Sequence, residues 1–227
     1  MNFNINDLLE YILPSIIPLI FGIGLHEAAH AYAARWMGDD TAERLGRITL
    51  NPIRHIDPFG TLILPILLLV MSNGSFSFGY AKPVPVNYVR LRRINMRTAM
   101  QVVAFAGPAA NLLMAFGWAI AFALFSSLTT DPFFTLMSQR GIELNLVLFA
   151  FNLFPILPLD GGRVLNGFLP RGLSESFQKL EPYGIWIVLF LVYATPNAFD
   201  NYWLKPITYV FGSLLRPMVN LIQSFFY

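Results

Sequence analysis

The chain is organised around the stretch Phe21-Gly-Ile-Gly-Leu-His-Glu-Ala-Ala-His-Ala-Tyr-Ala-Ala-Arg35, in which a His-Glu-x-x-His motif lies within apolar sequence. On a helix the four-residue spacing turns His26 and His30 to nearly the same face, so both imidazoles can reach one tetrahedral zinc ion. Glu27 then lies beside the metal, where its carboxylate can accept a proton from water. Ionisable side chains are costly in hydrocarbon and usually mark function there. The stretch therefore predicts a metal site within a membrane.

The composition places the chain among membrane proteins. Of its 227 residues, 56% are hydrophobic and 12% are charged, whereas charged residues make up about 25% of a typical soluble domain. The absence of cysteine excludes a disulfide framework and a thiol nucleophile, and it leaves His, Asp and Glu as metal ligands. The net charge of +2 is too small to suggest a nucleic-acid partner. We expect a single membrane-embedded domain over residues 1–227, with the lipid bilayer around it.

Two apolar segments are expected to pack around the motif. The first runs from about residue 8 to 36, long enough to span a hydrocarbon core of roughly 30 Å. Counting back from Asp39, where the segment reaches water, the two histidines lie about 13 to 20 Å along the helix. The second segment, about residues 99–128, carries small residues suited to close packing. It also carries Asn111, which can form a hydrogen bond into the site; the alternative is a role in helix packing alone.

Asp160 is the predicted third metal ligand. It ends a third, mostly apolar segment that begins near Ile142, and an aspartate in that setting needs a partner. A zinc ion with two histidine ligands needs a third, anionic ligand. Pro155 and Pro158 break the helix just before Asp160. Asn152 precedes the break, and its amide can donate to the developing oxyanion of a tetrahedral intermediate. The alternative interpretation of Asp160 is a helix cap at the membrane boundary.

Two polar stretches lie between the first two segments. Residues 46–60 contain His55, the only other histidine. His55 can be a metal ligand, but we expect a hydrogen-bonded structural or gating residue. In residues 72–87, Phe76 and Tyr80 belong to an alternating pattern with the period of a strand. That pattern predicts a small re-entrant strand or hairpin whose free edge pairs with substrate, and the alternative is a surface hairpin without a role.

Basic residues concentrate on the side where the first segment ends, at Arg35, Arg44, Arg47, Arg54, Arg90, Arg92, Arg93 and Arg97. By the positive-inside rule this side is cytoplasmic, so the site is expected to open toward the cytosol of a multi-pass cell-membrane protein. The expected fold class is an all-α polytopic membrane protein. It has a catalytic core at about residues 8–163 and C-terminal helical segments at about 164–227. Two or three further transmembrane or partial segments accompany the three-helix core.

Three motifs, in this order, resemble those of the site-2 protease family of zinc intramembrane proteases: His26-Glu-Ala-Ala-His30, Gly107-Pro-Ala-Ala-Asn111 and Asn152-Leu-Phe-Pro-Ile-Leu-Pro-Leu-Asp-Gly-Gly162. The resemblance covers about residues 22–163. Within the family the chain is similar to the short prokaryotic branch, which is without a PDZ domain or a C-terminal nucleotide-sensing domain. It implies one zinc ion on the two motif histidines and Asp160, with Glu27 as the general base. It also implies that Asn152 lies near the scissile carbonyl.

The function expected from these features is hydrolysis of a peptide bond in or near the transmembrane segment of a membrane-protein substrate. One alternative is a membrane-anchored zinc protease of the gluzincin kind, with Glu43 or Glu143 as third ligand. Another is a metal transporter or a non-catalytic scaffold. A transporter would be expected to carry charged residues along several membrane spans, whereas in this chain they collect at one place. A non-catalytic scaffold would have no need of the Glu27 carboxylate.

Overall fold

The computed structural model describes residues 5–63, 67 and 82–226, and every regular element in that part of the chain is helical. The long helices are α1 (Ile5–Trp36), α4 (Met96–Leu128), α5 (Pro132–Asn152), α8 (Glu181–Ala194) and α10 (Lys205–Gln223). The short elements are α2 (Thr41–Arg44), η1 (Pro52–His55), η2 (Pro58–Ile63), η3 (Tyr88–Arg90), α6 (Asp160–Phe168), α7 (Arg171–Gln178), α9 (Pro196–Phe199) and η4 (Asp200–Leu204). The predicted helical architecture is confirmed.

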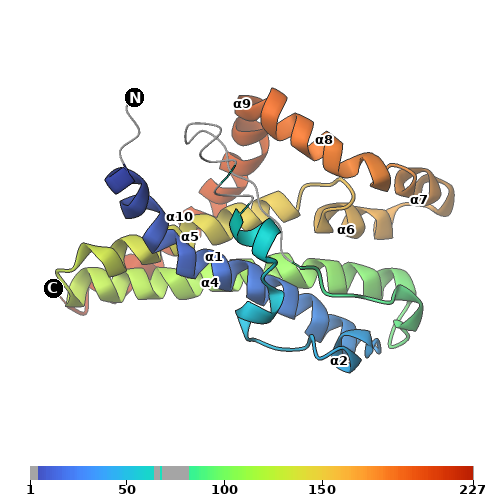
Figure 1. Ribbon diagram of the computed structural model, residues 1–227, viewed down its shortest axis with the longest axis horizontal. Coiled ribbons are helices and arrows are strands. Elements are labelled where there is room, and N and C mark those ends of the chain that lie inside the picture. The colour runs from blue at the N-terminus through green and yellow to red at the C-terminus, as the bar shows by residue number, and fades with distance from the viewer. Residues whose placement is uncertain (1–4, 64–66, 68–81, 227) are drawn as a thin grey trace.

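Helices α1, α4 and α5 pack against one another and form the three-helix core. Figure 1 shows α4 and α5 running alongside each other, with α6, α7 and α8 beyond the C-terminal end of α5. Helix α6 packs on α4, and α10 covers α4 and α5. The core therefore brings the His-Glu-x-x-His helix next to both segments that were expected to contribute site residues.

Small side chains allow these helices to approach closely. The fully buried residues of α1 and α4 are mostly alanines, namely Ala28, Ala31, Ala34, Ala99, Ala115, Ala119 and Ala123. Bulky apolar side chains on α4 point away from the core, and Leu113 is 71% exposed. This division is typical of helices in lipid, where the tails are as apolar as leucine and helices associate by close packing.

In the part of the chain that the structure describes, two helical segments are long and apolar enough to cross a membrane, Leu13–Trp36 and Met96–Leu128. A third results if α8 and residues 196–223, bent by 98° at a short break, form one broken span. Within the described residues, α5 does not meet the same test of length and composition. The prediction of a three-helix core with two or three further transmembrane or partial segments is thus confirmed only in part, by two or three candidate spans among the described residues.

The third predicted segment differs from the structure at its start. We expected it to begin near Ile142, but α5 begins at Pro132. The Asp131 carboxylate accepts the Phe133 N–H at 2.9 Å and caps the helix. Proline is favoured at the first helical position because an N–H at that position would have no intrahelical acceptor, so the lack of one costs nothing. The break predicted from the prolines is confirmed, since α5 ends at Asn152 and a new helix begins at Asp160.

The predicted strand is not found in the part of it that the structure describes. Residues 82–87 form neither helix nor strand, and Phe76 and Tyr80 lie outside the described residues. Hydrogen bonds fasten residues 82–87 beside α1: the Val84 N–H donates to a Glu27 carboxylate oxygen at 2.9 Å, and the Asn87 N–H donates to Asp39 at 2.6 Å.

Candidate metal centre

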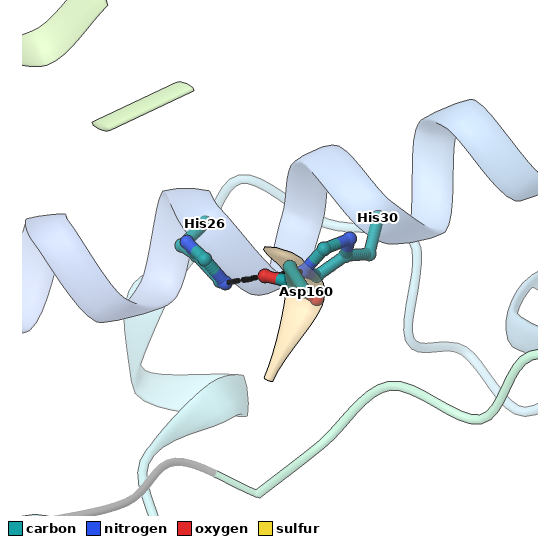
Figure 2. A group of neighbouring side chains, drawn as sticks. All are labelled: His26, His30 and Asp160. Carbon is teal, nitrogen blue, oxygen red and sulfur yellow. Dashed lines mark hydrogen bonds and ion pairs between the residues drawn. The ribbon is translucent and has the colours of Figure 1, made fainter. Parts of the chain in front are cut away.

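Three side chains from two helices converge on one point. Figure 2 shows His26 and His30 of α1 directed at the Asp160 carboxylate, which lies at the first residue of α6. Asp160 Oδ2 lies 3.1 Å from His26 Nε2 and 3.3 Å from His30 Nε2, and the two Nε2 atoms are 3.1 Å apart. Ligand atoms at zinc bond lengths of 2.0–2.1 Å on a tetrahedron are about 3.3 Å apart. The spacing therefore fits one zinc ion.

The positions of the ring protons support the same conclusion. His26 Nδ1 lies 2.6 Å from the Asn111 side-chain oxygen, and His30 Nδ1 lies 2.7 Å from the Val103 carbonyl oxygen. Both oxygens are acceptors, so each neutral ring carries its proton on Nδ1 and has a bare lone pair on Nε2. Neither Nε2 can then donate to Asp160, whose Oδ2 is buried without a hydrogen-bond partner. With both rings neutral, three acceptor atoms converge with no donor among them, and this arrangement suits a cation.

A glycine on α4 leaves room at this point. A Cβ atom at Gly107 would lie 2.4 Å from His30 Nε2 and 2.6 Å from His26 Nε2, closer than real Cβ contacts. Any other residue at this position would therefore press on the two ligand nitrogens. The lack of a side chain at Gly107 therefore leaves space beside the two Nε2 atoms, and this space also fits a metal-binding site.

The turn before α6 places Asp160. A Cβ atom at Gly161 would lie 2.1 Å from the Leu153 carbonyl oxygen, and one at Gly162 would lie 2.3 Å from the Ile156 carbonyl carbon. Two consecutive glycines thus let the start of α6 pack directly under the preceding turn. This contact fixes the carboxylate at the helix N-terminus, where the helix dipole favours negative charge.

Glu27 lies beside the three ligands without joining them. The group of possible metal ligands in the described chain consists of His26, His30 and Asp160. The carboxylate of Glu27 instead accepts the N–H of Val84 at 2.9 Å. Val84 lies between Pro83 and Pro85, which have no N–H of their own.

Two other predicted site residues, Asn152 and His55, form hydrogen bonds to backbone carbonyls and not to this group. The Asn152 amide donates to the Leu148 carbonyl of its own helix at 3.0 Å. His55 is fully buried, and its Nε2 lies 3.1 Å from the Thr49 carbonyl oxygen. It is not part of the ligand group among the described residues, and this contact is of the structural kind expected for it.

The two glutamates considered as alternative ligands are engaged elsewhere. Glu43 pairs with Arg35 at 2.5 Å, and Glu143 pairs with Arg140 at 2.8 Å. Both carboxylates are about half exposed. The third position near the motif histidines belongs to Asp160.

One contributing residue, Asn145, was not expected from the sequence. It is fully buried on α5 and accepts the Asn111 amide N–H at 3.1 Å. A polar side chain in the apolar run of α5 is the signal that points to it.

The chain is similar to named zinc metalloproteases. It is 42% identical over 191 residues to "Putative zinc metalloprotease YwhC" of Bacillus subtilis (strain 168), and the match covers 80% of each chain. It is 30% identical over 199 residues to "Putative zinc metalloprotease Rip2" of Mycolicibacterium smegmatis, which covers 85% of this chain and 70% of the relative. No family model and no solved structure matches it. The chain belongs to the zinc metalloprotease family that these relatives represent.

Proposed function

We propose that the chain is a zinc-dependent intramembrane endopeptidase of the site-2 protease kind, which cleaves peptide bonds in or near transmembrane segments of membrane proteins. The observation that carries the proposal is the convergence of His26 Nε2, His30 Nε2 and Asp160 Oδ2. The two histidines belong to the apolar segment Leu13–Trp36, which is long enough to cross a membrane. A zinc site on such a helix acts on substrates that reach it in the bilayer.

The residues of the site divide the chemistry among them. Zinc held by His26, His30 and Asp160 supplies Lewis acidity, which polarises a carbonyl and lowers the pKa of water. The Glu27 carboxylate takes the proton from the attacking water and returns it to the leaving amine. The Val84 N–H, which donates to one carboxylate oxygen of Glu27, orients the carboxylate for this transfer.

Asn152 is assigned to the scissile carbonyl of the substrate. Its amide donates to Leu148 in the structure, so this role requires the side chain to exchange an intrahelical bond for one to the developing oxyanion. Phe76 and Tyr80 stay the predicted substrate contacts.

The site is proposed to face the cytosol. Basic side chains gather at the C-terminal end of α1, where Arg93 donates to the Trp36 carbonyl at 3.1 Å and Arg90 pairs with Asp40 at 2.6 Å. Hydrogen bonding from Arg44, with the charges of Arg44 and Arg90, holds the pKa of the Asp40 carboxyl below its usual value. A concentration of arginine at one end of a spanning helix is typical of the cytoplasmic side.

The proposal is tested with purified protein in detergent and in liposomes, on candidate single-span substrates. We expect cleavage that stops when a chelator removes zinc and returns when zinc is added. A protein that cleaves soluble peptides but no single-span substrate would be a zinc protease without the intramembrane function. Cleavage that persists in the zinc-free protein would refute the metal's role.

A further inference from the structure

A line of buried polar contacts lies behind His26 and joins the three core helices. Asn145 of α5 donates through Nδ2 to the Gly141 carbonyl at 2.9 Å. Its side-chain oxygen accepts the Asn111 Nδ2 of α4 at 3.1 Å. The Asn111 oxygen faces His26 Nδ1 of α1 at 2.6 Å. Both asparagines are fully buried, so these contacts take the place of water.

The direction of every bond in this line follows from the carbonyl at its far end. The Gly141 oxygen can only accept, so Asn145 must present its NH₂ there and its oxygen to Asn111. Asn111 must then present its NH₂, which also reaches the Gly22 carbonyl at 3.0 Å. Its oxygen is left for His26, which therefore carries its proton on Nδ1.

Reversal of this line would leave unfavourable contacts. If the Asn111 amide turned over, its oxygen would face two other oxygens, those of Gly22 and Asn145. Its NH₂ would face His26 Nδ1, which would then have to accept and move its proton to Nε2. A protonated Nε2 has no lone pair for a metal. In a buried site no water is present to relieve such contacts.

We propose that Asn145 is a positioning residue that acts through Asn111 to hold His26 in the Nδ1–H tautomer and so keeps Nε2 free for zinc. It does not touch the ligand atoms itself. Gly22 leaves room for the Asn145 side chain, because a Cβ atom at Gly22 would lie 3.3 Å from the Asn145 side-chain oxygen. The inference rests on the proposed function only in taking His26 as a zinc ligand.

The test compares two substitutions of one residue. Asn145→Leu removes the acceptor for Asn111, and we expect zinc affinity, measured by competition with a chelator, to fall by about 10- to 100-fold. Asn145→Asp keeps an acceptor oxygen for Asn111, and its carboxyl can donate to the Gly141 carbonyl when it is protonated, so we expect its zinc affinity to exceed that of Asn145→Leu. If both substitutions weaken zinc binding equally, the acceptor function of Asn145 is refuted.

A second measurement reports the tautomer directly. The chain has three histidines, so the ¹⁵N spectrum of zinc-free protein labelled at histidine is simple enough to assign with a His26→Ala reference. In Asn145→Leu we expect the His26 nitrogens to shift toward the Nε2–H form. The His55 signals should stay unchanged, because His55 Nε2 lies against the Thr49 carbonyl oxygen and not against Asn111 or Asn145, and they report that the protein is folded.

Ser138→Ala is the matched control. Ser138 is also fully buried on α5, but its hydroxyl donates to Phe134 of the same helix. We expect wild-type zinc affinity for this variant. Wild-type zinc affinity and unshifted His26 signals in Asn145→Leu would overturn the inference. Absence of zinc binding in the wild-type protein would instead refute the proposed function.

Discussion

His26 and His30 lie one helical turn apart and offer the same ring nitrogen, yet the oxygen behind each belongs to a different kind of group. Behind His30 is the backbone carbonyl of Val103 at 2.7 Å, which cannot turn over. Behind His26 is the side-chain oxygen of Asn111 at 2.6 Å, which is held in place by further side chains. The two proposed ligands offer the same ring nitrogen and differ in the group that holds the other one.

This difference shows which of the two histidine contacts depends more on tertiary packing. The partner of His30 is a backbone carbonyl of α4, so this contact requires only that α1 and α4 pack together, and side-chain substitution at Val103 does not remove the carbonyl. The partner of His26 requires α1, α4 and α5 to be packed together, because Asn111 and Asn145 must meet between them. We therefore expect changes in helix packing to weaken zinc binding first at His26.

The largest effect on zinc binding is expected when either imidazole is removed, because both histidines offer their Nε2 atoms to the metal in the same way. His26→Ala and His30→Ala each remove one of the three proposed ligands, and we expect both variants to lose zinc and cleavage activity together. Metal analysis of the purified variants beside a cleavage assay measures this. Stoichiometric zinc in either variant would show that the corresponding imidazole is not a ligand.

A nearly complete loss is also expected for Gly107→Ala, which presses on both rings at once. The added methyl would lie 2.4 Å and 2.6 Å from the two Nε2 atoms, so zinc binding should fail while the helix still forms. The control is Gly117→Ala on the same helix, where a Cβ atom meets nothing within 4 Å among the described residues. That variant should keep its zinc and gain up to about 1 kcal/mol in helix stability. Equal zinc contents in the two variants would contradict the clearance argument.

Glu27→Gln separates binding of the metal from the chemistry. The amide cannot accept the proton of water, so we expect cleavage to fall by about 10²- to 10⁴-fold. Both histidines and Asp160 stay in place, so zinc content should remain at the wild-type value. The measurement is a cleavage rate paired with the metal-to-protein ratio of the same preparation. Cleavage near the wild-type rate would exclude Glu27 as the base.

The smallest effect in this series tests the difference between the histidines directly. Asn111→Leu removes the acceptor behind His26 and should lower zinc affinity by about 10- to 100-fold. Asn111→Asp keeps an acceptor for the ring N–H and should bind zinc more tightly than Asn111→Leu. Competition with a chelator measures both. Equal zinc affinity in the two variants would mean that the hydrogen bond to His26 does not secure the ligand.

Part of this arrangement could be predicted from local sequence. The four-residue spacing of the histidines fixes their common face on a helix. The prolines before Asp160 predict the break in front of it, and the structure has that break. The start of α5 differs from the predicted one because Asp131 caps the helix and Pro132 opens it, well before Ile142.

The rest depends on contacts between distant parts of the chain. The clearance at Gly107 and the meeting of Asn145 with Asn111 arise only when α1, α4 and α5 pack together. The Val84 N–H reaches Glu27 across 57 positions of sequence. No local pattern carries such information, because a buried asparagine or a glycine in an apolar helix serves packing as readily as it serves a site.

The central claim is that Asp160 completes a zinc site with the two motif histidines, and one set of metal-to-protein ratios tests it most directly. Asp160→Asn is nearly isosteric but neutral, so we expect it to bind far less zinc than the wild type and to lose activity. Glu43→Gln and Glu143→Gln remove carboxylates that pair with arginines at about half-exposed positions, and we expect wild-type zinc content for both. Full zinc in Asp160→Asn, with loss in either glutamate variant, would contradict the three-ligand site.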